Sequence, residues 1–212
     1  MIRGAIFDAD GTLLDSMHIW NELGERYLRS IGKTPEKELS KILFPMSLEE
    51  SCKYLKKRYS ISESEETIKK SILSIISDFY TKEVMPKKGV SEILKALESK
   101  KIPMAIATAT DKTLLKAALV RLGIEKYFIT LLTCSELSTT KHKDTVYRKA
   151  ADILGTKPME TAVFEDVLFA LQTAKRAGFI TVAVEDEASA SEREAIKALA
   201  DFYITDFTQC TF

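Results

Sequence analysis

Cysteine is scarce in this sequence, and neither sign of charge is in excess. The three cysteines, Cys52, Cys134 and Cys210, are far apart and form no CxxC pair or Cys/His cluster, which argues against a disulfide framework and a zinc site. Lysine plus arginine and aspartate plus glutamate each total 31, so no global field would attract nucleic acid or an anionic membrane surface. Local groups must therefore hold any anionic ligand.

Long hydrophobic runs and low-complexity stretches are also lacking. No segment approaches the ~20 apolar residues of a membrane span, and the N-terminal run is too short for a signal peptide. We therefore expect a cytoplasmic protein without nucleic-acid or membrane partners. The oligomeric state stays open, and a monomer is compatible with the sequence. A chain of 212 residues with 45% apolar content can build one sizeable core, or a core with a second small domain.

Six short apolar runs have the length of β-strands. They are nearly continuous rather than alternating, which indicates burial on both faces. From about residue 86 they alternate with amphipathic segments of helix length, such as 89–100 and 112–122, as in a parallel sheet covered by helices. The sequence therefore predicts an α/β fold with a doubly wound parallel sheet. The runs cover residues 2–7, 103–108, 129–133, 161–164, 180–184 and 202–205.

Residues 16–84 interrupt this alternation. The segment contains helical stretches at about 17–31, 47–59 and 63–83, with no convincing strand between them. The second stretch opens with Ser47 three residues before Glu50, the pattern of a capping box. We therefore expect a core formed by residues 1–15 and 85–212, and an inserted all-helical domain formed by residues 16–84.

Two carboxylates follow the first predicted strand. Asp8 and Asp10 are separated by one residue, so their side chains point the same way, and Gly11 allows the backbone to turn after them. An ordinary turn rich in aspartate and glycine would contain the same residues. The pattern alone therefore leaves a structural and a catalytic interpretation open.

Hydroxyl and cationic groups follow the next two predicted core strands. Thr108 ends one strand, where its hydroxyl and the free amides after it can hold phosphate oxygens. A helix cap is the other interpretation, although Thr110 or Asp111 could fill that role. Lys141 follows the next strand and could neutralise a phosphate as a point charge, with Lys143 as a rival.

A pair of acids ends the fourth apolar run. Glu165 and Asp166 are costly at a buried strand end unless a cation or hydrogen bonds meet them. Mg²⁺ prefers carboxylate oxygens and would suit this position. Because the carboxyl ends of parallel strands share one edge of the sheet, the sequence predicts that these acids lie near Asp8.

Taken together, these segments resemble the motifs of the haloacid dehalogenase superfamily. Residues 7–16, Phe-Asp-Ala-Asp-Gly-Thr-Leu-Leu-Asp-Ser, resemble its first motif, and Thr108 and Lys141 its second and third. Residues 164–166 followed by 174–178 resemble its fourth, and the resemblance spans the whole chain. The helical insert is similar to the cap of the phosphoglycolate phosphatase and beta-phosphoglucomutase branch.

The resemblance implies an Mg²⁺-dependent reaction on a small phosphorylated metabolite. Asp8 would be the nucleophile that forms an aspartyl-phosphate, and Asp10 the general acid and base. The metal would be held by Asp8, by the backbone carbonyl of Asp10 and by Asp166, with Glu165 as a further ligand or as support for its water shell. The phosphate oxygens would be bound by Thr108, the Ala109 amide and Lys141.

Departures from the family pattern weigh against a mutase. Trp20 stands where beta-phosphoglucomutases carry a cap-side histidine, and no phosphate-binding arginine is evident near residues 44–47. The third motif lacks the usual Lys-Pro-x-Pro-Asp, and Val167 replaces the hydroxyl residue expected after the fourth-motif acids. Trp20 could stack on a sugar or base in the cap, or belong to the core of the insert.

A phosphatase acting through an aspartyl-phosphate is thus the leading hypothesis. The first alternative is a phosphosugar mutase, which would return the phosphoryl group to a reoriented intermediate instead of releasing inorganic phosphate. The second is a non-catalytic binding module in which Asp8 is a phospho-acceptor or metal site, and turnover would exclude it. The sequence does not identify the metabolite.

Overall fold

The computed structural model of the protein describes residues 2–43 and 45–210. Contacts between residues divide the chain into two compact units. One unit, Met1–Ser16 with Val84–Phe212, contains the strands and is called the sheet unit; the other, Met17–Glu83, is called the helical unit. The proposed role of the insert as a substrate cap stays a prediction.

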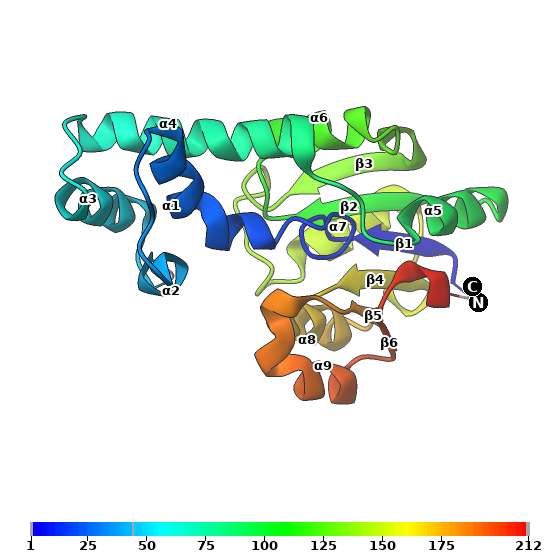
Figure 1. Ribbon diagram of the computed structural model, residues 1–212. Coiled ribbons are helices and arrows are strands. Elements are labelled where there is room, and N and C mark those ends of the chain that lie inside the picture. The colour runs from blue at the N-terminus through cyan, green and yellow to red at the C-terminus, as the bar shows by residue number, and fades with distance from the viewer. Residues whose placement is uncertain (1, 44, 211–212) are drawn as a thin grey trace. The chain divides into compact units, whose positions relative to one another are not determined.

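Over the described residues, the sheet unit contains a six-stranded, all-parallel sheet in the order β3-β2-β1-β4-β5-β6 (Figure 1). The order reverses beside β1, which places this strand in the centre. Each of the six apolar runs matches one strand to within two residues at either end, so the predicted α/β fold with a doubly wound parallel sheet is confirmed. The strands are β1 (Gly4–Phe7), β2 (Met104–Thr108), β3 (Phe128–Thr133), β4 (Thr161–Glu165), β5 (Ile180–Val184) and β6 (Phe202–Ile204).

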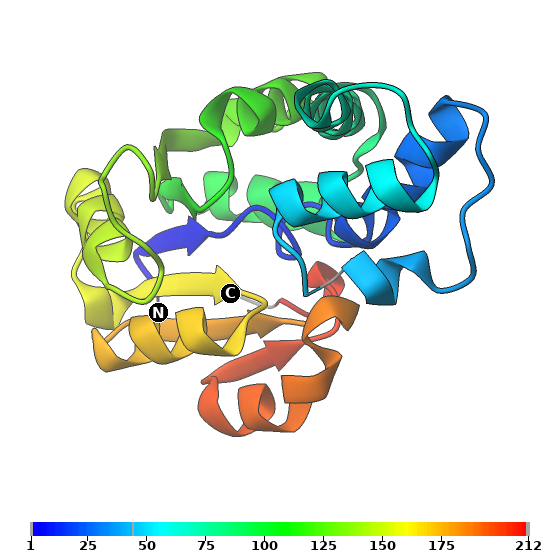
Figure 2. The same cartoon turned by 90° about the vertical axis from the view of Figure 1, so that its left-hand side faces the viewer.

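Helices cover both faces of this sheet (Figure 2). One face carries α5 (Val90–Ser99) and α6 (Lys112–Arg121), which confirm two predicted helices. The other carries α7 (Thr145–Leu154), α8 (Leu168–Arg176) and α9 (Arg193–Leu199). Short helical turns complete the unit: η2 (Glu125–Tyr127), η3 (Pro158–Glu160), η4 (Glu187–Glu192) and η5 (Phe207–Gln209).

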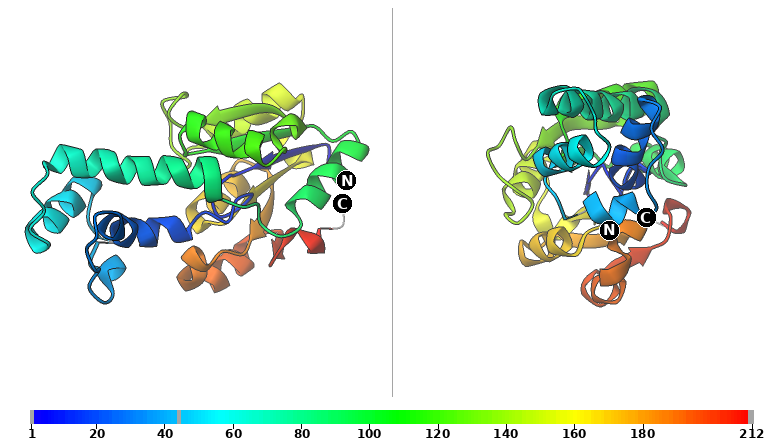
Figure 3. Two further views of the ribbon diagram at one scale, coloured as in Figure 1. Left: turned by 45° about the horizontal axis from the view of Figure 1, so that its top comes forward. Right: turned by 60° about the vertical axis from the view of Figure 1, so that its left-hand side comes forward.

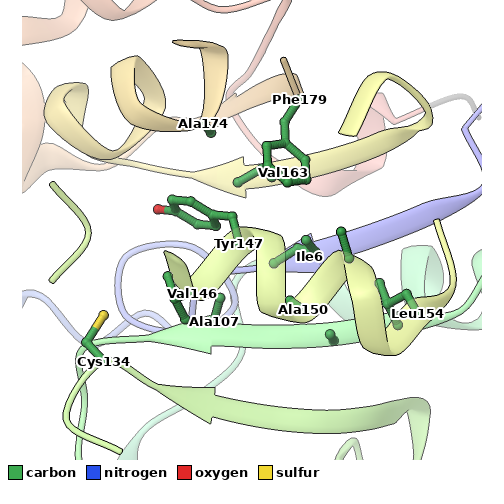
Figure 4. Close-up of a cluster of buried hydrophobic side chains, with 12 residues drawn as sticks. Ile6, Ala107, Cys134, Val146, Tyr147, Ala150, Leu154, Val163, Ala174 and Phe179 are labelled. Carbon is green, nitrogen blue, oxygen red and sulfur yellow. The ribbon is translucent and has the colours of Figure 1, made fainter. Parts of the chain in front are cut away.

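The two faces of the central strands pack differently. On one side, Phe7 stacks on Phe164 with ring centroids 4.3 Å apart, and Phe207 packs against both rings. On the other, Tyr147 of α7 lies in a cluster with Ile6 and Val163 (Figure 4). Both faces of β1 are thereby removed from water, which holds the residues that follow it on a rigid support.

The helical unit contains α1 (His18–Ser30), α2 (Leu39–Leu43), α3 (Leu48–Arg58) and α4 (Glu65–Asp78). A π-helical segment, η1 (Phe79–Glu83), continues α4 as one long helix (Figure 3). The predicted capping box is confirmed: Ser47 accepts a hydrogen bond from the Glu50 amide, and Glu50 accepts one from the Ser47 amide. The sequence did not predict α2, because five residues are too few to establish a period.

The two segments that join the units pair with each other. The Asp15 amide donates to the Met85 carbonyl at 2.9 Å, and the Lys87 amide donates to the Leu13 carbonyl, also at 2.9 Å. An antiparallel bridge joins Leu14 and Pro86 between these bonds. The chain therefore leaves the sheet unit and returns to it through neighbouring segments.

No helix in the described ranges is both long enough and apolar enough to cross a membrane.

Candidate active site

Four polar residues lie at the carboxyl ends of three neighbouring strands. Asp8 follows β1, Thr108 ends β2, Glu165 ends β4, and Asp166 follows it. Phe7 pairs with Ile106 on one side and with Phe164 on the other, so the three strand ends are adjacent. All four residues are buried, with exposed fractions between 0% and 5%. The structure therefore places these residues close together, as the sequence predicts.

Lys141 reaches the same place from the loop before α7. Its ammonium group pairs with Asp8 Oδ1 and lies 2.7 Å from Glu165 Oε1. Its side chain is 7% exposed, whereas the rival Lys143 is exposed on the surface. Of the two lysines, Lys141 is thus the one that carries charge into the site.

The carboxylates of Asp8, Glu165 and Asp166 form a compact acidic cluster. One oxygen from each lies within 4.8 Å of one from each of the others. Glu165 Oε2 and Asp166 Oδ2 are buried, and neither has a hydrogen-bond partner among residues 2–43 and 45–210. Buried carboxylate oxygens without partners are costly, and a hard cation with oxygen ligands would remove that cost. The residues present therefore fit a divalent metal ion.

The protonation equilibria of this cluster reflect its burial. Burial, and next the negative charge of Glu165, raise the pKa of Asp8 well above its ordinary value, against the opposing effect of Lys141. The same two causes raise the pKa of Asp166 to about 7. For Lys141, burial lowers the pKa, but the carboxylates of Asp8 and Glu165 outweigh it and raise the pKa overall. A bound cation would favour the charged form of both aspartates.

Two hydroxyl groups hold the side chain of Asp10. Ser16 Oγ donates to Asp10 Oδ1 at 2.5 Å, and Thr110 Oγ1 donates to Asp10 Oδ2. Gly11, with φ of 74°, turns the chain directly after it, and its amide donates to the Leu14 carbonyl at 3.0 Å. Hydrogen bonds from hydroxyl donors to both carboxylate oxygens therefore fix the orientation of the Asp10 side chain.

The loop after β2 resolves one of the alternatives that the sequence left open. Asp111 caps α6 by accepting hydrogen bonds from the amides of Thr113 and Leu114. Thr110 is therefore not the cap. Thr108 is buried and its hydroxyl accepts a hydrogen bond from the Thr110 amide. Ala109, between them, is exposed. The phosphate-binding roles of Thr108, Ala109 and Lys141 stay predictions.

Three contacts were missed at the sequence level. Tyr147 Oη donates to Glu165 Oε1 at 2.7 Å, Thr12 Oγ1 donates to Asp166 Oδ1 at 3.3 Å, and Thr110 holds Asp10. Thr12 and Thr110 lie within the motifs and could have been suspected from their position. Tyr147 gave no signal beyond its place on the apolar stripe of a helix. Val167, where the family has a hydroxyl, makes no side-chain cap for α8.

Trp20 lies in the helical unit and is 48% exposed, so it is not part of that unit's core. It borders a cavity between helices. Its proposed contact with substrate stays a prediction. The two histidines, to which the sequence assigned no role, pack against aromatic rings: His18 against Phe79 and His142 against Phe169.

Comparison with known proteins gives a consistent result. The family model for haloacid dehalogenase-like hydrolases matches residues 5–184. A phosphorylated carbohydrates phosphatase of Thermotoga maritima is 28% identical over 177 residues, covering 84% of this chain and 82% of the relative. A validoxylamine A 7'-phosphate phosphatase of Streptomyces hygroscopicus subsp. limoneus is 25% identical over 210 residues, covering 99% and 96%.

Among solved structures, one described as a putative beta-phosphoglucomutase from Thermotoga maritima superimposes with a TM-score of 0.82 at 26% identity. The match covers 96% of this chain and 94% of the other. Because the family model also spans most of the sequence, the chain belongs to the haloacid dehalogenase-like hydrolases.

Proposed function

We propose that this enzyme is an Mg²⁺-dependent phosphatase that hydrolyses a small phosphorylated metabolite through an aspartyl-phosphate on Asp8. The observation that carries the proposal is the buried group of Asp8, Lys141, Glu165 and Asp166, with Asp10 oriented separately beside it. The family and its named phosphatase relatives make the chain a phosphoric monoester hydrolase.

Asp8 has the burial and the charge environment expected of a nucleophile in phosphoryl transfer. A carboxylate oxygen of Asp8 attacks phosphorus, and the bond from phosphorus to the leaving oxygen breaks. Lys141 pairs with Asp8 in the resting protein and would neutralise phosphate oxygens in the complex. Thr108 and the Ala109 amide would bind the remaining oxygens.

Asp10 would supply the protons. In the first step it donates a proton to the leaving oxygen. In the second, its carboxylate takes a proton from the water that attacks the aspartyl-phosphate, releasing inorganic phosphate and restoring Asp8. Ser16 and Thr110 would keep Asp10 in one orientation through both steps.

Asp8, Asp166 and the main-chain carbonyl of Asp10 would hold Mg²⁺, with Glu165 alongside. When bound, the ion supplies positive charge that screens the nucleophile from the charge of the phosphate. The unpaired oxygens of Glu165 and Asp166 support this assignment.

A phosphosugar mutase is the second candidate, because a solved structure described as a putative beta-phosphoglucomutase has the same fold. A mutase must hold two phosphates in turn. Trp20 in place of the cap-side histidine and the lack of an arginine near residues 44–47 count against it. Release of inorganic phosphate from a monophosphate, without a bisphosphate activator, separates the two functions.

The decisive experiment measures phosphate release from phenyl phosphate with Mg²⁺, after exhaustive chelation, and with Ca²⁺. We expect turnover only with Mg²⁺, and inhibition by Ca²⁺, because its larger and looser coordination disturbs the in-line geometry. The Asp8→Asn protein, purified in parallel, controls for contaminating phosphatases. Full activity after chelation would contradict the proposed site.

A further inference from the structure

A second buried ion pair lies near the acidic cluster of the sheet unit, in addition to the one that Lys141 forms. Lys87 Nζ lies 2.7 Å from Asp186 Oδ2, and only 12% and 8% of the two side chains are exposed. Lys87 Nζ also donates to the Glu185 carbonyl at 2.6 Å. Because removal of one partner leaves a buried charge uncompensated, such a pair is costly to break. The reaction proposed above assigns no role to either residue.

Lys87 connects the segments that follow the two neighbours of β4. Its amide donates to the Leu13 carbonyl after β1, whereas its ammonium group holds the residues after β5. In the sheet, β4 lies between β1 and β5, and Asp166 follows β4. Thr12, next to Leu13, donates to Asp166 Oδ1 at 3.3 Å. Lys87 therefore ties together the segments on either side of this proposed metal ligand.

Asp186 lies beside Asp166. Both line a cavity of about 10 Å³, which has room for about one water molecule. Burial and the charge of Glu165 raise the pKa of Asp166 most, and the charge of Asp186 raises it further. The charge of Lys87 lowers the pKa of Asp166. Within the described residues, the acidic cluster does not include Asp186. A fourth carboxylate is therefore a neighbour of the cluster without belonging to it.

The charge of Asp186 is met by Lys87. Arg193 borders the same cavity, but it pairs with Glu185 at 2.9 Å. Asp186 Oδ1 accepts a hydrogen bond from the Ala188 amide at 2.9 Å, and Asp186 Oδ2 faces Lys87. Both oxygens of this carboxylate are thus engaged by groups outside the acidic cluster.

We propose that Lys87 is a positioning residue for the metal site, which holds Asp186 aside so that the bound ion meets the carboxylates of the acidic cluster and not a fourth. This inference rests on the metal site of the proposed function. Without the charge of Lys87, the Asp186 carboxylate can turn toward a cation beside Asp166. Ca²⁺ takes more oxygen ligands than Mg²⁺, at longer distances and in looser geometry. Lys87 therefore favours the smaller ion.

Calorimetric titration of Mg²⁺ and of Ca²⁺ into the metal-free protein tests the proposal without turnover. In Lys87→Met, we expect the ratio of Mg²⁺ affinity to Ca²⁺ affinity to fall at least about tenfold below the wild-type ratio. Lys88→Met is the matched control, because Lys88 is 75% exposed and pairs with Asp206 at 2.9 Å, and its ratio should equal that of the wild type. An equal fall in both variants would overturn the inference.

Further variants separate the charge of Asp186 from the packing of Lys87. Lys87→Met combined with Asp186→Asn removes both charges, and the ratio should return to the wild-type value. A ratio that stays low in this double variant would show that lost packing changes the site, and would refute the restraint of Asp186. Lys87→Gln keeps a donor for the Glu185 carbonyl without the charge, and should also lower the ratio. It takes the place of Lys87→Met if circular dichroism shows that the methionine variant is unfolded.

The titrations also distinguish this inference from the proposed function. Wild-type protein that binds neither ion would contradict the proposed metal site, and the inference with it. Wild-type protein that binds Mg²⁺, with the same affinity ratio when Lys87 loses its charge, would overturn the role of Lys87 alone.

Discussion

The acidic edge of the sheet unit and the cavity of the helical unit differ in the charge of the side chains that form them. At the edge, four ionisable groups with little exposure to water lie together, those of Asp8, Lys141, Glu165 and Asp166. In the cavity, no described wall residue carries a charge, and Ser51 contributes a single buried hydroxyl. The two regions therefore carry different chemistry: ionisable groups gather at the edge, and uncharged side chains surround the cavity.

The two regions also differ in how the chain builds them. The edge takes residues from β1, β2, β4 and the loop before α7, which are far apart in sequence and fixed by a parallel sheet. The cavity is formed by four helices that follow one another in the chain. A change at the edge should therefore affect groups contributed by several distant segments, whereas a change in the cavity wall should affect the local stability of the helical unit.

Of the substitutions that test the difference between the two units, the one at Asp8 is expected to have the largest effect. Asp8→Asn removes the nucleophile, and we expect kcat to fall by at least about 10⁴-fold. Single-turnover phosphate release measures it, with mass spectrometry to exclude deamidation back to aspartate. Retention of more than a few per cent of turnover would mean that a water molecule, and not Asp8, attacks the phosphorus.

A smaller loss is expected at Asp10, by roughly 10²- to 10⁴-fold in kcat, because Asp10→Asn removes the general acid and base. The asparagine carbonyl can still accept a hydrogen bond from Ser16 or Thr110. Magnesium affinity, measured by titration calorimetry, should remain largely intact, since the proposed contact with the ion is the main-chain carbonyl. Loss of magnesium binding would identify the side chain as a ligand and move the acid–base role elsewhere.

Replacing a tyrosine by phenylalanine should affect magnesium affinity differently in the two units. Tyr147→Phe removes the hydroxyl that holds Glu165 Oε1 and should weaken magnesium binding by about 10- to 100-fold. Tyr54→Phe removes a comparable hydroxyl contact, to Glu36 at 2.8 Å in the helical unit, and should leave the affinity unchanged. Calorimetry on both variants tests this, and equal affinities would exclude a positioning role for Tyr147.

The last predicted effect concerns the folding stability of the metal-free protein, which should depend on pH. The pKa of Asp166 in the folded protein is about 7, against 3.8 for an ordinary aspartate, so between these values the folded state binds more protons than the unfolded state. The metal-free protein should therefore lose stability as pH rises from about 4 to about 7, by at most about 1.4 kcal/mol per pH unit from this group. Saturating magnesium should reduce this slope, because the cation replaces the proton.

Urea unfolding of the metal-free protein at several pH values measures the slope. Asp166→Asn is the matched control, since it removes the titrating group and should make the slope smaller than that of the wild type. An identical slope in the two proteins would mean that other groups control the pH dependence.

Much of the sheet unit could be predicted from the sequence, for physical reasons. A strand buried on both faces leaves a continuous apolar run, and parallel strands bring their carboxyl ends to one edge. Asp8 and Asp166 could therefore be placed together although 158 positions separate them in the numbering. The acidic residues stand out because charge at the end of an apolar run is otherwise costly.

What could not be predicted depends on packing between distant side chains. Tyr147 occupies an ordinary apolar position of a helix, and only the folded structure shows that its hydroxyl meets Glu165. The sequence left two interpretations of Trp20 open, a place in the core of the insert and a contact with a ligand. Its 48% exposure depends on how α1 packs on its neighbours. No sequence motif marks the cavity. Its wall side chains are of the same kinds as those in the core of a helical domain, and only their packing leaves a space unfilled.

The paired segments Leu13–Asp15 and Met85–Lys87 have a consequence for modularity. Their hydrogen bonds hold the ends of the insertion together within the sheet unit, whatever is folded between them. The entropy cost of closing a loop grows slowly with its length, by about 0.6 kcal/mol for each doubling. The helical unit can therefore be exchanged, extended or shortened at little cost to the sheet. Variation in the length or sequence of the insertion can therefore leave the acidic edge of the sheet unit unchanged.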